Sequence, residues 1–264
     1  MKVVDLSVPT GPGPGEPLQP AIDYEDHERT APLIAQIFGC EPGDLPDGKG
    51  WASETVTLIT HAGTHVDAPW HYFPTSGGER ARTIDELPLD WFLRPGVRLD
   101  LREMAWGDRI EVPDLEAALA AAGHSLAPLD IVLLWTGAER AWDSPEYFNA
   151  GSGLTRASTT WLLEQGVKVI GTDAWGLDRP FAALRAEYER TGDASILWEA
   201  HRAGIDREYC QIEKLHNLGA LPAATGFTVS CLPIKVAGAS AGWCRAAAIV
   251  DQRADQHAGR DPDA

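Results

Sequence analysis

Features that would place a protein in several common classes are missing from this sequence. Its four cysteines lie far apart in 264 residues and include no Cys-x-x-Cys pair, which argues against a disulfide framework and favours reduced, buried thiols. No apolar run approaches the roughly 20 residues that cross a bilayer, and the first residues hold no apolar run of signal-peptide length. No internal repeat is present. We therefore expect a cytoplasmic protein.

Basic residues are also scarce relative to acidic ones. The sequence contains 22 lysines and arginines against 39 aspartates and glutamates, which gives a formal net charge of −17. An acidic surface repels phosphate groups, so nucleic acid and anionic membranes are not expected as partners. The same charge does not oppose a bound metal cation. Apolar residues make up 44% of the chain, enough for a substantial core and too many for a disordered chain.

Three imidazoles and one carboxylate fall within residues 61–71, which read His-Ala-Gly-Thr-His-Val-Asp-Ala-Pro-Trp-His. Residues 54–60 are rich in β-branched side chains and predict a strand that opens into this segment. In an extended chain, His61, His65 and Asp67 would share one face, because even numbers of residues separate them. Neutral imidazole and carboxylate are ligands of Zn²⁺, Mn²⁺ and Fe²⁺. The segment therefore predicts a metal site rather than a set of ordinary hydrogen-bonded histidines.

Several residues around this segment leave alternatives open. His71 follows the proline that breaks the strand, so it is either a further ligand or a base beside a metal-bound water. Trp51, Trp70 and Trp175 could form an aromatic wall for the substrate or pack in the core, and of these we expect Trp51 and Trp70 to contact substrate. Asp173 could orient a ligand imidazole or cap a turn.

The pattern of apolar and turn-forming residues predicts one α/β domain with a mixed sheet and helices packed on it. We expect this domain to span residues 1–250, and residues 251–264 to form a polar tail that frays. Residues 21–50 are an insertion that acts as a lid, as an oligomer contact, or as neither. The predicted strands are 3–6, 54–60, 96–101, 130–135, 167–171, 225–235 and 245–250, and the predicted helices are 28–38, 114–123 and 155–165.

The motif His61-x-Gly-Thr-His65-x-Asp67-x-Pro-x-His71 resembles the signature of the cyclase-like metallohydrolases. This family includes bacterial kynurenine formamidase, isatin hydrolase and certain polyketide-pathway cyclases. The resemblance extends to Asp-Leu-Ser-Val-Pro from residue 5, to Gly-Thr-Asp at 171–173, and to residues 232–238 with the arginine at 245. It implies a swivelling β/β/α fold with a barrel-like core, and a homodimer or homotetramer.

The resemblance also gives meaning to two residues that are weak evidence alone. His201 ends the stretch 194–201, which we interpret as a helix, and Glu213 follows twelve residues later with Asn-Leu after it, as in the formamidases. The family match implies a binuclear site in which Asp67 and Glu213 are shared, His201 binds the second ion and His71 shuttles protons. The motif's first two histidines would bind the first ion. Isatin hydrolase-like members use one metal, so we expect one or two ions per chain, zinc or manganese.

These residues predict a metal-dependent hydrolase that uses metal-activated water on a small, aromatic substrate. The bond cleaved would be the C–N bond of a formamide or cyclic amide, or the C–O bond of a lactone. Two alternatives are a metal-dependent cyclase or dehydratase in a biosynthetic pathway and a non-catalytic metal-binding protein. The formamidases place a tryptophan before the turn that matches residues 12–16; none precedes it here, which leaves the substrate open.

Overall fold

The computed structural model describes residues 1–250, which form two compact units. Of these residues, the larger unit contains 1–17 and 60–250, and the smaller unit contains 18–59. The expected polar tail, 251–264, lies outside the described residues, and the domain boundaries stay a prediction. No helix among residues 1–250 is long and apolar enough to cross a membrane.

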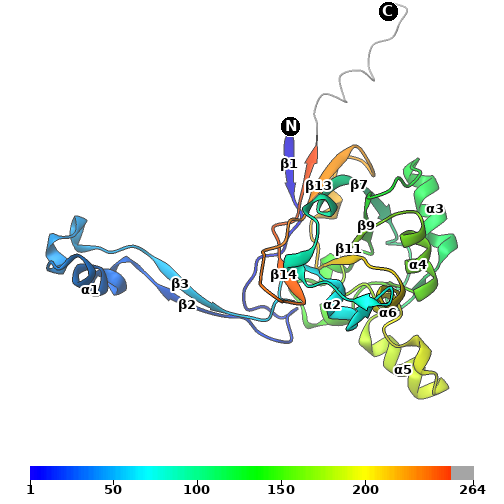
Figure 1. Cartoon of the computed structure of the whole chain (residues 1–264), viewed down its shortest axis with the longest axis horizontal. Coiled ribbons are helices and arrows are strands. Elements are labelled where there is room, and N and C mark those ends of the chain that lie inside the picture. The colour runs from blue at the N-terminus through cyan, green and yellow to red at the C-terminus, as the bar shows by residue number, and fades with distance from the viewer. Residues whose placement is uncertain (251–264) are drawn as a thin grey trace, which may run out of the picture. The chain divides into compact units, whose positions relative to one another are not determined.

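A nine-stranded mixed sheet forms the centre of the larger unit (Figure 1). Four neighbouring strands, β7, β9, β11 and β12, run parallel, and antiparallel strands extend the sheet on both sides. This confirms the predicted α/β class. In sheet order the strands are β1 (Lys2–Asp5), β15 (Ala247–Val250), β13 (Phe227–Ser230), β7 (Leu93–Asp100), β9 (Ile131–Trp135), β11 (Val169–Thr172), β12 (Cys210–Glu213), β4 (His65–Asp67) and β14 (Ala241–Trp243).

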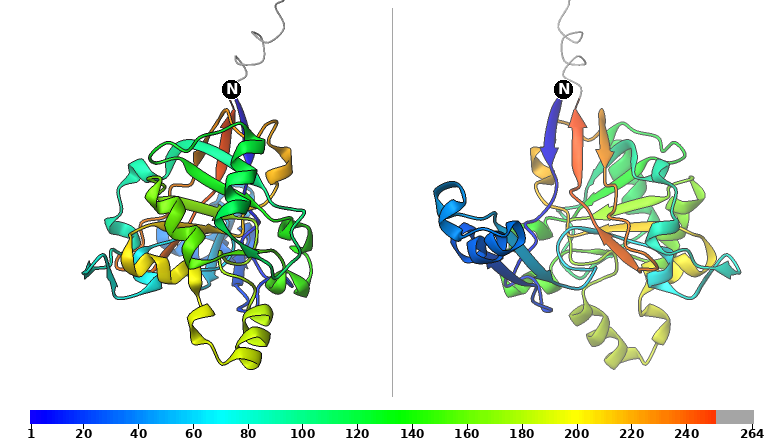
Figure 2. Two further views of the ribbon diagram at one scale, coloured as in Figure 1. Left: turned by 90° about the vertical axis from the view of Figure 1, so that its right-hand side faces the viewer. Right: turned by 60° about the vertical axis from the view of Figure 1, so that its left-hand side comes forward.

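Helices cover one face of this sheet (Figure 1 and Figure 2). Buried side chains of β7, β9 and β11 pack there against α3, α4 and α6, and the opposite face packs against loops of the same unit. The predicted helix signals hold: Thr155 caps α4 through the Ser158 amide, and Gly123 ends α3 in the left-handed conformation at φ 63°. The helices are α2 (Pro69–Tyr72), α3 (Val112–Ala122), α4 (Arg156–Glu164), α5 (Phe181–Thr191) and α6 (Glu199–Asp206); short strands are β5 (Thr75–Ser76), β6 (Glu79–Arg80), β8 (Arg109–Ile110) and β10 (Gly153–Leu154).

The smaller unit is a hairpin with one helix. Strand β2 (Ala21–Glu25) pairs antiparallel with β3 (Ser53–Thr57), and α1 (His27–Phe38) lies between them in the sequence. Its small core consists of Ala31, Ile34, Ala35 and Leu45. The helix was expected over 28–38 and is confirmed. Whether this unit acts as a lid or an oligomer contact stays a prediction.

The strand predicted over 54–60 is shorter than expected, and the extended course assumed from His61 to Asp67 is wrong. Strand β3 ends at Thr57, the chain turns over residues 60–64, and a separate strand, β4, begins at His65. Gly63 has φ 60° within this turn, and a Cβ there would lie 2.8 Å from the Thr10 hydroxyl, so the turn requires glycine. The alternation of faces therefore holds for His65 and Asp67 but does not apply to His61.

Candidate metal centre

Strands β4 and β12 place three of the predicted ligands on one face of the sheet. In their antiparallel register Glu213 lies opposite His65, and Gln211 lies opposite Asp67. Residues opposite each other in such a pair point to the same side, so all four side chains share the face that α6 covers. His65 and Asp67 have no exposed surface, and Glu213 is nearly as buried. The prediction that His65 and Asp67 point the same way is confirmed.

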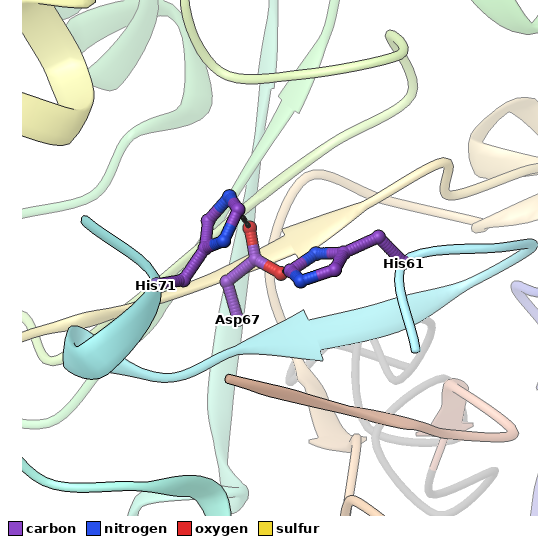
Figure 3. A group of neighbouring side chains, drawn as sticks. All are labelled: His61, Asp67 and His71. Carbon is purple, nitrogen blue, oxygen red and sulfur yellow. Dashed lines mark ion pairs between the residues drawn. The ribbon is translucent and has the colours of Figure 1, made fainter. Parts of the chain in front are cut away.

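The other two histidines of the motif reach Asp67 from outside the strand (Figure 3). His61 comes from the turn before β4, with its Nδ1 2.8 Å from Asp67 Oδ1. His71 comes from α2, with its Nε2 3.8 Å from Asp67 Oδ2. His65 Nε2 lies 3.2 Å from Asp67 Oδ1 and 3.5 Å from Glu213 Oε2. One carboxylate is thus the common neighbour of three imidazoles.

His201 also joins this group, but not from the end of a helix as expected. Residues Ala194–Ile196 form a short 3₁₀ turn, and Trp198 adopts φ 56°, which interrupts the chain before α6 begins at Glu199. His201 therefore lies in the first turn of α6. Its ring centroid is 5.3 Å from that of His71. The distal residues predicted from the resemblance are brought to the motif.

Hydrogen bonds hold the imidazoles in position. His65 Nδ1 donates to the Gly63 carbonyl oxygen at 2.8 Å, which turns Nε2 toward the carboxylates of Asp67 and Glu213. His61 Nε2 lies 3.0 Å from Ser240 Oγ, and His201 Nδ1 is hydrogen-bonded to the Asp178 carboxylate. These three histidines thus have one nitrogen engaged and the other facing the centre of the site.

A buried ion pair supports the turn that carries His61. Lys214 Nζ donates to both carboxylate oxygens of Glu16 at 2.9 Å and to the His61 carbonyl oxygen at 2.8 Å. Glu16 Oε1 also accepts from the Gly63 amide at 2.7 Å. Both charged side chains are almost completely buried. The pair connects the N-terminal loop, the ligand turn and the end of β12, and sequence reasoning did not find it.

The charges of the site shift its pKa values in opposite directions. Burial raises the pKa of Asp67, but the imidazoles of His71 and His65 outweigh burial and bring it well below its usual range. Burial lowers the pKa of His65, but Asp67 and then Glu213 raise it to about 10. Burial likewise lowers the pKa of His201, but the Asp178 carboxylate outweighs burial and raises that pKa to about 9. For His71, burial is the largest effect and lowers the pKa, so its imidazole is neutral at pH 7.

The unpaired polar atoms of the site fit a divalent cation. His65 Nε2 and both carboxylate oxygens of Asp67 are buried without a hydrogen bond of acceptable geometry. Buried polar groups in proteins are almost always paired. We therefore expect a group from outside the chain to bind these atoms. Two sets of donor atoms lie within 4.8 Å of one another: His61, Asp67 and His71, and His65, Asp67 and Glu213. Nitrogen and carboxylate donors suit zinc or manganese.

The remaining sequence candidates have mixed outcomes. Asp173 accepts hydrogen bonds from the Thr136 and Gly137 amides, both at 2.8 Å, so it caps a turn, and it is Asp178 that orients an imidazole. Trp70 is partly exposed beside the motif. Trp51 lies in the smaller unit, edge-on to Phe38. Contact of Trp70 and Trp51 with substrate stays a prediction.

We predict that Lys214→Met weakens both folding and metal binding. The variant leaves the buried Glu16 carboxylate without its lysine counter-charge, which costs about 3–5 kcal/mol of unfolding free energy. Mn²⁺ affinity should fall at least about tenfold, because the turn that carries His61 loses its anchor. Urea denaturation and Mn²⁺ titration calorimetry measure these changes. Lys235→Met, at an exposed lysine, is the control, and equal effects of the two variants would contradict the role of the pair.

Metal binding should release protons. Because the pKa values of His65 and His201 are about 10 and 9, both carry a proton at pH 7.5 in the metal-free protein, and a cation must displace it. Affinity should therefore rise with pH, by about tenfold per unit for each proton displaced. Mn²⁺ titrations at one pH in buffers of different ionisation enthalpy should show at least one proton released. His124→Ala, outside the site, should give the same number; zero protons would contradict the assignment.

Comparison with known proteins identifies the relatives of this chain. Residues 4–179 match the family model described as "Putative cyclase". The kynurenine formamidase of Erythrobacter litoralis (strain HTCC2594) is 29% identical over 195 residues, which cover 72% of this chain and 74% of that protein. The kynurenine formamidase of Salinibacter ruber (strain DSM 13855 / M31) is 29% identical over 193 residues, covering 73% and 77%.

A solved structure shares the fold. An isatin hydrolase bound to the product analogue thioisatinate superposes with a TM-score of 0.73 at 20% identity, covering 95% of this chain and 93% of that one. The family model covers well over half of this chain and includes the whole histidine motif. The chain therefore belongs to the Cyclase family of enzymes.

Proposed function

We propose that the protein is a metal-dependent hydrolase of a small aromatic amide, cleaving the C–N bond of a formamide or a cyclic amide. The observation that carries the proposal is the buried carboxylate of Asp67, which lies among three imidazoles without a hydrogen bond of acceptable geometry. Relatives named kynurenine formamidase and a structural neighbour named isatin hydrolase support amide bonds as the target. A lactone C–O bond is a second bond type open to the same chemistry.

The residues of the site divide the work between binding and proton transfer. His61, His65 and Asp67 would hold one ion, with Glu213 and His201 able to complete a second position that shares Asp67. A bound Zn²⁺ or Mn²⁺ would supply Lewis acidity that polarises the substrate carbonyl and lowers the pKa of the attacking water. His71 is suited to accept the water's proton, because its imidazole is neutral at pH 7 and a third of its side chain is exposed. The nearby Asp67 carboxylate would stabilise the protonated His71 ring. His71 would then give the proton to the leaving amine.

One observation favours a second candidate, a serine hydrolase. Ser240 Oγ, His61 and Asp67 are connected in the order of a catalytic triad, at 3.0 and 2.8 Å, and residues 238–242 read Gly-Ala-Ser-Ala-Gly. Two features weigh against it. Asp67 Oδ1 has no hydrogen bond of acceptable geometry, and Ser240 leads into strand β14 rather than into a helix. We therefore interpret Ser240 as a support for the ligand His61.

The metal-dependent mechanism predicts a large effect at His71. In protein loaded with Mn²⁺, His71→Ala should lower kcat/KM for formanilide or isatin by about 10²–10⁴-fold while the metal content stays unchanged. His124→Ala, at a part-buried histidine that is paired with Asp130 outside the site, serves as the matched control. A loss smaller than about tenfold at full metal loading would rule out the proton-transfer role.

Ser240→Ala and a chelator separate the two candidates. If Ser240 only supports His61, the variant should weaken Mn²⁺ affinity by about 10–100-fold, the usual effect of removing a support of a metal ligand, and activity should return at saturating Mn²⁺. Treatment with EDTA should abolish activity of the wild-type protein. Activity that survives EDTA, disappears in Ser240→Ala and is not rescued by metal would instead establish the serine mechanism.

A further inference from the structure

An open groove with apolar walls lies on the larger unit between three segments. These are the 3₁₀ turn Pro145–Asn149, helix α5, and the two residues before α6. Its volume is about 750 Å³, within the 300–1,000 Å³ of typical small-molecule sites. Phe181, Tyr188, Leu197 and Trp198 line it, and each of the four is 37–56% exposed. Large exposed apolar side chains gathered in one concave place are uncommon without a ligand.

The floor of the groove is aromatic and packed. Phe148 and Phe181 are stacked with ring centroids 5.2 Å apart. Trp175 lies behind them and meets both rings edge-on, at 5.0 Å and 5.5 Å. Rings held by one another in this way present a rigid surface on which a further aromatic ring can stack.

The groove shares two of its neighbours with the metal centre. The Trp198 ring lies 6.1 Å from the His201 ring, and Trp198 is held at φ 56°, a left-handed conformation that is costly for a tryptophan. On the other side, the Lys214 ammonium lies 4.9 Å from the centre of the Trp175 ring, and Lys214 directly follows Glu213. The aromatic surface therefore runs from the predicted second-ion ligands outward into the groove.

We propose that this groove binds the aromatic part of the substrate and selects amides with an extended, two-ring aryl group over single-ring ones. The inference rests on the proposed hydrolase function and adds a substrate class to it. Helix α5, Leu197 and Trp198 all lie after residue 179, where the match to the family model ends, whereas Phe148 and Trp175 lie within it. A substrate amide at His71 and His201 would extend its rings past Trp198.

The test compares two substrates that differ by one ring, formanilide and N-(2-naphthyl)formamide. Wild-type protein loaded with Mn²⁺ should prefer the naphthyl substrate in kcat/KM by at least about tenfold, and Trp198→Ala or Phe181→Ala should reduce this preference by about tenfold, as expected for the loss of one aromatic contact. Trp106→Ala removes a tryptophan of similar exposure that does not line the groove and should leave the preference unchanged. A preference unaffected by the groove variants would overturn the proposal and leave the hydrolase function standing.

A binding measurement keeps the test independent of turnover. The probe 8-anilinonaphthalene-1-sulfonate should bind the wild-type protein saturably with one site, and Trp198→Ala should weaken it about tenfold. If neither formamide is hydrolysed but the probe binds in this way, the proposed reaction fails and the groove stands as an aryl-binding site. The absence of saturable probe binding would overturn the proposal. It would also be overturned if Trp198→Ala changed the oligomeric state and left the probe affinity unchanged. That second result would make the groove a contact between copies of the chain.

Discussion

The structure of the site depends on one constraint, the complete burial of the Asp67 carboxylate among imidazoles, with no hydrogen bond of acceptable geometry to either oxygen. A buried carboxylate needs a compensating charge or several donors, and here the nearest groups are imidazoles. Strand β4 lies between β12 and β14, so the residue cannot turn toward solvent. Without a cation the histidines take up protons to balance the charge, and with one they release them. The same geometry thus explains the raised pKa of His65 and the fit to a metal ion.

The scaffold around this carboxylate consists largely of contacts between distant parts of the sequence. Glu213 lies opposite His65 only because β12 pairs with β4, and Lys214 then reaches back to Glu16 and to the ligand turn. A buried ion pair is weak evidence for stability, since desolvation offsets most of its attraction. Its value here is positional, because it fixes the turn that carries His61 and leads into the three-residue strand β4. The aromatic groove extends the same arrangement outward from His201 and Trp175.

Sequence reasoning predicted the parts that local pattern determines. The apolar run 131–135 is a buried strand, Gly123 ends its helix, and His65 and Asp67 alternate onto one face. His61 does reach Asp67, but the extended geometry predicted for it was wrong, because Gly63 turns the chain before β4 and even spacing does not reveal such a turn. It could not find the ion pair of Glu16 and Lys214, because the two residues are 198 positions apart in the sequence. The sequence did contain a local signal for Ser240, the glycines at 238 and 242 that flank it. For Asp178 the sequence showed only an acidic residue five positions after Asp173, with nothing to connect it to His201.

The central claim is that a divalent transition metal satisfies Asp67 and its histidines. Elemental analysis by plasma mass spectrometry, on protein purified without chelators and on Asp67→Asn in parallel, tests this most directly. The account predicts one or two equivalents of zinc or manganese in the wild-type protein and a loss of most of that metal in a variant that still folds. A wild-type protein that contains no such metal, and takes none up when zinc or manganese is added, would contradict it.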